Sequence, residues 1–288
     1  MFNILVTGSN GQLGSELKEL APNYPNYNFI FTDVEEFDIC NHNEVKQFIA
    51  TNNINTIINC AAYTAVDKAE DQFELANEIN NLAVANFARI AKEHNIKFVH
   101  ISTDYLFDGT NHKPYVETDI PNPQSVYGKT KLNAEIAIQE INPVNSIIIR
   151  TSWVYSSYGN NFVKTMLRLG REKEELGIVY DQIGTPTYAG DLAKAILETL
   201  PKLKNEKVEI YHYSNQGVCS WYDFAKAIFE IANIKLKVNA IESTQYPTPA
   251  KRPFYSVMHK AKIQETYKIE VPYWKDSLSK CLNKINKC

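Results

Sequence analysis

The sequence has little of several residue types that mark specialised classes of protein. Its 288 residues include only 5 cysteines, 11 glycines and 12 prolines. So little glycine and proline excludes collagen-like and low-complexity chains. The cysteines are odd in number, scattered and without a Cys-x-x-Cys pair, so we expect reduced thiols rather than a disulfide scaffold. They stand at positions Cys40, Cys60, Cys219, Cys281 and Cys288.

The sequence also lacks long apolar runs and a surplus of one charge. No stretch approaches the ~20 apolar residues that span a bilayer, and the N-terminus shows no basic segment followed by a cleavage site. Lys plus Arg number 30 against 33 Asp plus Glu, for a formal net charge of -3. Nucleic-acid binding needs a basic face, so we expect no nucleic-acid partner, no membrane contact and a cytoplasmic location. The six histidines show no spacing typical of zinc ligands, so we predict no zinc site.

What the chain does have is a regular alternation of strand-length apolar runs and helical periods. The predicted strands cover residues 3–7, 28–33, 56–60, 97–102 and 146–151; the predicted helices cover residues 12–20, 45–49, 72–94 and 127–140. Continuously apolar strands separated by helices are typical of a parallel sheet covered on both faces. We therefore predict a doubly wound, Rossmann-like α/β domain over residues 1–150. Residues 151–288 should form a smaller C-terminal lobe, with elements within 188–213 returning to the sheet.

A glycine-rich turn follows the first predicted strand and opens the first predicted helix. Gly8, Gly11 and Gly14 stand at a spacing of three, one residue longer than the standard dinucleotide fingerprint. Such glycines let the backbone turn, approach a pyrophosphate and pack the helix against the strand, while the helix N-terminus faces the negative charge. The alternative is a strand–helix turn that binds nothing. The context favours nucleotide binding.

Acidic residues follow the second predicted strand. Asp33 lies 25 residues after Gly8, where a carboxylate can accept hydrogen bonds from ribose hydroxyls and would repel a 2′-phosphate. No Lys or Arg follows directly, so Asp33 favours NADH over NADPH. Asp38 and Ile39 would hold and cover the adenine ring, or Asp38 would merely cap the next helix.

A tyrosine and a lysine share one face of a predicted helix. Tyr127 and Lys131 are four residues apart, so the ammonium is expected to lower the pKa of the phenol and make it a proton donor or acceptor. Lys131 can also hold a nicotinamide ribose. Thr103, at the carboxyl end of the fourth strand, would add a hydroxyl. The alternatives are a solvated Lys131, a partly buried Tyr127 and a turn-capping Thr103.

Together these residues resemble an extended short-chain dehydrogenase/reductase and, within that class, the dTDP-4-dehydrorhamnose reductase family across nearly the whole chain. Two of the matching runs, Ala-Val-Asp-Lys-Ala-Glu and Tyr-Pro-Thr-Pro-Ala-x-Arg-Pro, are far more specific than the glycine turn. The matching segments are residues 8–14, 61–70, 102–109, 126–131, 150–155, 159–162 and 246–253.

The resemblance implies a catalytic set of Thr103, Tyr127 and Lys131, a dinucleotide and a nucleotide-sugar substrate. The implied reaction is reduction of the 4-keto group of dTDP-4-dehydro-L-rhamnose to dTDP-L-rhamnose by NADH or NADPH, with Tyr127 delivering the proton. The implied dinucleotide contacts are Gly8, Gly11, Gln12, Leu13, Gly14, Asp33, Asp38, Ile39, Ala62, Tyr63, Thr64, Tyr127 and Lys131. The implied substrate contacts are Thr103, Asp104, Trp153 and Arg252; by itself, Trp153 reads equally as core or as a platform for the base.

Two departures from related enzymes matter. Sugar-nucleotide dehydratases of the same superfamily follow the catalytic Thr with Asp-Glu, whereas Tyr105 stands here after Asp104, which favours a one-step reduction. Some family members dimerise through a magnesium site built from glutamates, but Ser15 and Asp191 stand here where such glutamates are expected. We therefore do not predict magnesium, and we expect a monomer or homodimer. His259, where an aliphatic residue is usual, has no chemical account.

Two alternatives remain open at this point. The chain would reduce a different 4-keto nucleotide sugar with the same chemistry, or it would be a non-catalytic subunit resembling the regulatory subunit of methionine adenosyltransferase. The complete Thr103, Tyr127 and Lys131 set speaks against the second alternative, because a binding protein gains nothing from a proton donor there.

Overall fold

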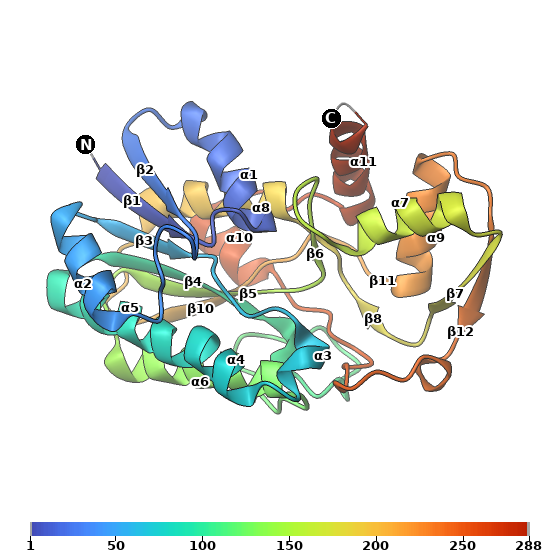
Figure 1. Cartoon of the computed structure of the whole chain (residues 1–288), viewed down its shortest axis with the longest axis horizontal. Helices are drawn as coiled ribbons and strands as arrows, with labels where there is room; N and C mark the ends of the chain where they lie inside the picture. The colour runs from blue at the N-terminus through green and yellow to red at the C-terminus, as the bar shows by residue number, and fades with distance from the viewer. Residues whose placement is uncertain (1, 287–288) are drawn as a thin grey trace.

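A six-stranded parallel sheet forms the centre of the computed structural model, which describes residues 2–286 (Figure 1). The strand order is β10-β5-β4-β3-β1-β2, and each neighbouring pair is parallel. The strands are β1 (Phe2–Thr7), β2 (Tyr27–Thr32), β3 (Thr56–Asn59), β4 (Lys97–Thr103), β5 (Ser146–Thr151) and β10 (Glu209–His212).

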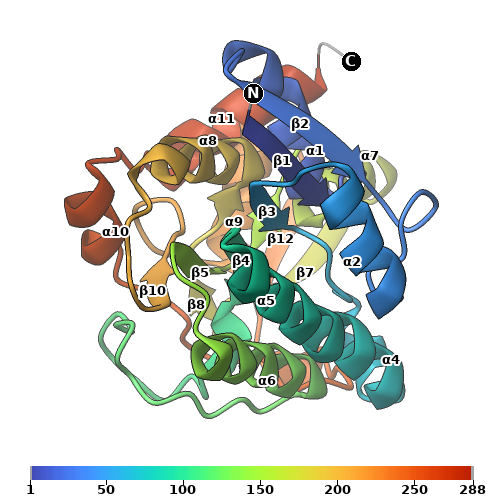
Figure 2. The ribbon, with the colours of Figure 1, turned by 90° about the vertical axis from the view of Figure 1, so that its left-hand side faces the viewer.

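Helices cover both faces of this sheet, which confirms the doubly wound fold. On one face Leu17 and Ile196, from α1 and α8, pack with Ile4 of β1. On the other face Phe87 of α5 packs with Leu5 of β1. Figure 2 shows α1 and α8 on one side of the strands and α2, α5 and α6 on the other. The helices are α1 (Gln12–Leu20), α2 (His42–Thr51), α3 (Val66–Ala69), α4 (Phe73–Asn77), α5 (Ala83–His94), α6 (Val126–Ile141), α7 (Phe162–Glu172), α8 (Ala189–Thr199), α9 (Trp221–Ile231), α10 (Ala261–Tyr267) and α11 (Trp274–Ile285).

The helix expected over residues 72–94 is interrupted in the structure. Between α4 and α5 the chain makes a π-helical turn over Glu78–Leu82. Within this turn the Asn80 side chain accepts a hydrogen bond from the Tyr63 amide at 2.8 Å and donates to the Tyr63 carbonyl at 3.1 Å. Such turns are frequent at functional sites, and here the turn ties the helix to the loop that follows β3.

A separate hydrophobic core lies at the far end of the molecule from β2. It is formed by α7, α9 and α11 with Tyr155 and Tyr188. Three short strand pairs accompany it: β6 (Val154–Tyr155) with β9 (Thr187–Tyr188), β7 (Glu175–Val179) with β12 (Lys237–Ile241), and β8 (Ile183–Gly184) with β11 (Cys219–Ser220). Strand β10, by contrast, pairs with β5 in the large sheet. The division into two domains at residue 150 stays a prediction.

The order of the strands creates a crevice between β1 and β3. The chain leaves β1 for β2 on one side and then crosses to β3 on the other, so β1 and β3 diverge at a topological switch point. Ligands of open α/β sheets bind outside the carboxyl ends of strands at such a point.

Two further sequence expectations concern thiols and membranes. Cys40, Cys60, Cys219 and Cys281 are unpaired, as expected, while Cys288 lies outside the described residues. None of the helices within residues 2–286 combines the length and the apolar character that crossing a bilayer requires.

Candidate active site

The glycine-rich turn has the close packing that its sequence predicts. Gly8 adopts φ +65°, and a Cβ on it would lie 2.7 Å from the Ala61 nitrogen; a Cβ on Gly14 would lie 2.4 Å from the Gly8 carbonyl oxygen. Gly11 caps α1 without any side-chain hydrogen bond to the first turn. The free amides at this helix N-terminus therefore face the crevice, where an anionic group can use them.

The acidic residues after β2 are held by short backbone contacts. Asp33 accepts hydrogen bonds from the amides of Asn10 at 2.8 Å and Val34 at 2.9 Å, which fixes its carboxylate against the glycine turn. Asp38 accepts from the Cys40 amide at 2.9 Å. The next helix is capped by Asn41 instead, so the alternative that Asp38 merely caps α2 is wrong.

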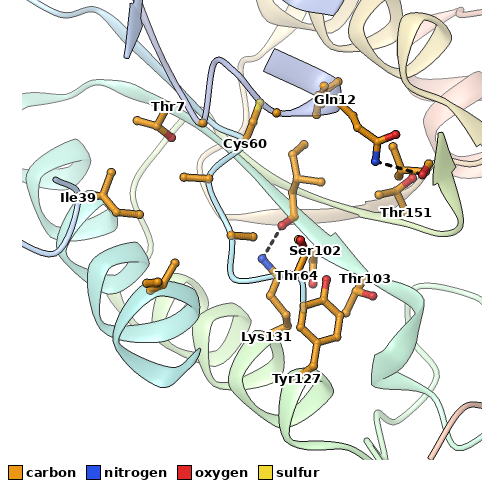
Figure 3. A pocket seen from close by; sticks show the side chains of 18 of the residues that line it. Thr7, Gln12, Ile39, Cys60, Thr64, Ser102, Thr103, Tyr127, Lys131 and Thr151 are labelled. Carbon is orange, nitrogen blue, oxygen red and sulfur yellow. Dashed lines mark hydrogen bonds between the residues drawn. The ribbon is translucent and has the colours of Figure 1, made fainter. Parts of the chain in front are cut away.

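The proposed catalytic residues come from two neighbouring elements. Thr103 ends β4 and its hydroxyl accepts from the Tyr105 amide at 3.2 Å. Ser125 caps α6, which starts the helix so that Tyr127 and Lys131 extend toward β4, with Thr103 beside the Tyr127 ring (Figure 3). Lys131 is only 1% exposed, so the alternative of a solvated lysine is wrong. Thr103 combines turn capping with a position in the site.

The Lys131 ammonium is directed away from solvent into the sheet. Its Nζ donates to the Ile101 carbonyl oxygen at 2.7 Å and lies 3.1 Å from Nε2 of His100. Burial lowers the pKa of Lys131 to about 8, with the nearby Glu135 carboxylate acting in the opposite direction.

The pKa of Tyr127 differs from the expectation. Burial raises it to about 12, while a hydrogen bond with Thr103 lowers it and the Asp104 carboxylate raises it. The prediction of a pKa below the ordinary value is therefore wrong, because the burial of the phenol outweighs the hydrogen bond that lowers its pKa. Burial also raises the pKa of Asp104 to about 6. Its Oδ2 is buried and lacks a hydrogen-bond partner among the described residues.

A single cavity of about 880 Å³ joins most of the predicted site residues. This volume suits a sizeable ligand. The predicted residues that line the cavity are Gly8, Gly11, Gln12, Leu13, Asp33, Asp38, Ile39, Ala62, Thr64, Thr103, Asp104, Tyr127, Lys131 and Trp153.

Three predicted contacts do not line this cavity. Gly14 instead packs α1 against the turn, and Tyr63 donates through its hydroxyl to Gln72 Oε1 at 2.7 Å. Arg252 forms an ion pair with Asp67, at 2.8 and 3.0 Å, so the two most specific sequence runs meet each other there. These three residues lie outside the cavity lining because each is held by a contact that the sequence did not reveal.

Trp153 lies in the cavity wall and is stacked from behind. Its backbone is in the left-handed region, with φ +48°, and its ring stacks on Trp221 with centroids 3.6 Å apart. Gly184 allows this arrangement, because a Cβ there would lie 2.7 Å from the Trp153 ring. Trp153 thus packs on Trp221 and also lines the cavity, and its role as a platform for the base stays a prediction.

Several residues of the site were missed from the sequence. Asn80 fixes the loop after β3, while Asn59 and His100 form polar contacts beneath Lys131. The only sequence feature that could have pointed to Asn59 and His100 is that each is a polar residue beside apolar residues of its strand. Ser102 also lines the cavity.

The matched family and the relatives agree with this geometry. A family model described as the RmlD substrate binding domain matches residues 2–287. The chain is 43% identical to a dTDP-4-dehydrorhamnose reductase from Aggregatibacter actinomycetemcomitans, covering 96% of this chain and 97% of the relative. It is 40% identical to the enzyme of that name from Escherichia coli K12, covering 99% and 98%.

Solved structures give the same result. A dTDP-4-dehydrorhamnose reductase from Clostridium acetobutylicum superposes with a TM-score of 0.93 at 42% identity, covering 99% of this chain and 100% of the other. One from Bacillus anthracis, in complex with NADP, has a TM-score of 0.93 at 39% identity over the same shares. The chain therefore belongs to the dTDP-4-dehydrorhamnose reductase family and is an oxidoreductase of the extended short-chain dehydrogenase/reductase class.

Proposed function

We propose that this chain reduces the 4-keto group of dTDP-4-dehydro-L-rhamnose to dTDP-L-rhamnose with NADH or NADPH. The observation that carries the proposal is the meeting of Thr103, Tyr127 and Lys131 with the glycine turn in one cavity. The relatives named above support the substrate. A Bacillus subtilis relative, 38% identical, is named a spore coat polysaccharide biosynthesis protein, and we assign the product to cell-surface polysaccharide synthesis.

The residues around the glycine turn fit a dinucleotide. The close-packed glycine turn brings the uncapped start of α1, with the amides of its first turn, toward a pyrophosphate, while the Gly11 amide itself donates to the Gly8 carbonyl oxygen at 3.1 Å. Asp33 would hold the adenosine ribose, Asp38 and Ile39 the adenine, and Ala62 and Thr64 the opposite wall of the same cavity. Gln12 and Leu13 complete the floor. When bound, the reduced nicotinamide supplies the hydride.

Tyr127 is the proton donor in this proposal. Its raised pKa of about 12 keeps the phenol protonated at neutral pH, and an alkoxide is a much stronger base than a phenolate, so the transfer is downhill. Lys131 and the Thr103 hydroxyl stabilise the negative charge that forms as hydride arrives and that then passes to Tyr127. Lys131, with a pKa of about 8, is mostly an ammonium at neutral pH.

Substrate contacts are assigned to the opposite side of the cavity. The partnerless Asp104 Oδ2 is suited to accept from a sugar hydroxyl, and the Trp153 ring offers a flat surface to the nucleotide sugar. Arg252 acts by holding the loop of residues 246–253 onto Asp67, and reaches a diphosphate only when that ion pair opens. The proposed partner is thus a nucleotide sugar.

We also propose that Asp33 favours NADH. Its carboxylate is fixed by two amides and would repel a 2′-phosphate. Because a relative was solved in complex with NADP, we expect Asp33 to shift the preference between the two cofactors rather than to exclude NADPH. Magnesium is not part of the proposal: Asp191 is engaged by Asn215 at 2.8 Å and by Ser277, and residues 2–286 contain no group of three or more acidic, His or Cys side chains placed for a metal.

The test is oxidation of NADH and NADPH by the purified chain with enzymatically prepared dTDP-4-dehydro-L-rhamnose, beside Tyr127→Phe. Turnover that nearly disappears in the variant supports both the reaction and the proton donor. Cofactor binding without turnover would overturn the substrate and favour another 4-keto nucleotide sugar or a regulatory subunit. Failure to bind either cofactor would overturn the function as a whole.

A further inference from the structure

A row of buried polar side chains runs beneath Lys131 across three strands. Thr7 donates to Asn59 Oδ1 at 2.6 Å, the Asn59 amide nitrogen lies 3.2 Å from His100 Nδ1, and His100 Nε2 lies 3.1 Å from Lys131 Nζ. The strand register places Thr7 beside Asn59 and Asn59 beside His100. None of the four residues is more than 1% exposed, so the row is shielded from bulk solvent.

The contacts of this row, with the Asn59 amide nitrogen facing His100 Nδ1, cannot hold while Lys131 is an ammonium. A neutral imidazole has one N–H, so one ring nitrogen donates and the other accepts. If Lys131 is an ammonium it can only donate, so His100 Nε2 accepts and Nδ1 carries the hydrogen. Asn59 must then turn its oxygen toward Nδ1. A half-turn of the amide exchanges its oxygen and nitrogen within nearly the same volume, and the nitrogen then donates to the Thr7 hydroxyl oxygen.

The arrangement with the Asn59 nitrogen facing Nδ1 fits a neutral Lys131 amine. With the Asn59 nitrogen donating to Nδ1, the ring hydrogen is on Nε2, and it donates to the lone pair of a neutral Lys131 amine. Going from one state to the other releases one proton in total: Lys131 loses one hydrogen, and the ring hydrogen changes from Nδ1 to Nε2. In both states the facing groups of Asn59, His100 and Lys131 pair a donor with an acceptor, which avoids the cost of an unsatisfied group at these contacts.

We propose that His100 is a positioning residue for Lys131. The neutral His100 ring, oriented by Asn59, exchanges tautomers as Lys131 gains or loses a proton. The ring thereby holds the Lys131 nitrogen in one place in both protonation states. The acceptor role of the Ile101 carbonyl at 2.7 Å is common to both states. His100 does not line the cavity and acts only through Lys131.

The surroundings keep His100 neutral while Lys131 titrates. Burial and the Lys131 charge hold the pKa of His100 well below its usual range. The charged group that acts on Lys131 is the Glu135 carboxylate, from the same helix, and the charged group that acts on His100 is Lys131 itself. The Glu135 carboxylate is bound by Arg150 at 2.7 Å, so that ion pair adds little net charge.

The first experiment needs no substrate. We would label histidine with ¹⁵N and follow the ring shifts of His100 from below to above the pKa of Lys131, about 8. The expected result is a neutral ring throughout, with the hydrogen on Nδ1 at low pH and on Nε2 at high pH. In Lys131→Met the change with pH should disappear. A tautomer that stays the same over this range in the unmodified chain would overturn the proposal.

The second experiment uses turnover and rests on the proposed function. His100→Phe offers Lys131 neither donor nor acceptor, so we expect kcat to fall about 10²-fold, as for a misplaced catalytic group. The alkaline limb of the pH profile should move to lower pH by roughly one unit, because the ammonium has lost an acceptor. His100→Gln, whose amide presents either end, should restore much of both.

The matched control is His212→Gln. His212 is another fully buried histidine, but it contacts Arg150 and the Tyr115 carbonyl and not Lys131. It should lower stability without moving the pH profile. Identical pH profiles in His100→Phe and the unmodified chain would overturn the proposal. If no substrate turns over at all, the proposed function fails while the ¹⁵N measurement still decides the role of His100.

Discussion

The two walls of the cavity are built in different ways. On the dinucleotide side the predicted residues lie in the turns and loops that follow strands: Gly8 comes directly after β1, Asp33 directly after β2, and Ala62 lies in the loop after β3. On the opposite side Trp153 depends on Trp221 and Gly184. The first wall is a local consequence of strand–turn–helix units, whereas the second exists only once distant segments have packed. Mutations should therefore affect the two walls differently.

The largest effect is expected at the junction of the two walls. Tyr127→Phe removes the proposed proton donor while keeping the ring, so kcat should fall by about 10²–10⁴-fold, with cofactor affinity nearly unchanged. The rate of NADH oxidation measures kcat, and a fluorescence titration measures cofactor affinity. Equal losses in both would place Tyr127 in binding rather than in proton transfer.

A pH-dependent stability effect is expected next, at Asp104. Its pKa is raised from 3.8 to about 6 in the folded chain, so the folded state holds a proton that the unfolded state releases. The free energy of unfolding should thus be highest below pH 4 with respect to this group, and fall by roughly 3 kcal/mol as pH rises to 6. Urea unfolding of Asp104→Asn should lack this dependence; a parallel decline in the variant would contradict the assignment.

Gly8→Ala probes the locally built wall. The substitution forces a Cβ into the left-handed region and within 2.7 Å of the Ala61 nitrogen, so stability should fall by roughly 2–3 kcal/mol and cofactor binding should weaken. Gly177→Ala is the matched control, because its Cβ meets only the flexible Ile241 side chain. Thermal unfolding with and without cofactor distinguishes the two variants. Equal losses of stability and cofactor binding in both would show that the close packing at Gly8 has no special role.

Trp221→Ala probes the wall assembled by tertiary packing. Without its stacking partner Trp153 loses its fixed orientation, and we expect KM for the nucleotide sugar to rise about tenfold, or 1.4 kcal/mol, with kcat nearly unchanged. Trp221→Phe should lose less. A fall in kcat alone would show that the stacked pair acts on the reacting groups rather than on substrate binding.

The smallest effect is expected at Asp33. Asp33→Ala removes the carboxylate that repels a 2′-phosphate, so the ratio of NADH to NADPH efficiency should fall several-fold, by about 1 kcal/mol of charge interaction. Kinetics with both cofactors measure this ratio. An unchanged ratio would mean that Asp33 serves only to hold the glycine turn through Asn10.

The sequence by itself determined the elements and the local site. Apolar runs and helical periods are local properties, so the strands of the large sheet and the placement of Gly8, Thr103 and Tyr127 at the ends of strands and helices could be predicted. The sequence predicted a C-terminal lobe over residues 151–288 but not the helices α7, α9 and α11 that form its core, because these helices contact one another across long stretches of chain. Only the tertiary structure decided three features: the contact of Lys131 with His100, the hydrogen bonds of Asn80 and the Arg252–Asp67 ion pair. The direction of a charged side chain and its pKa depend on burial and on partners distant in the sequence, which spacing along the chain does not give.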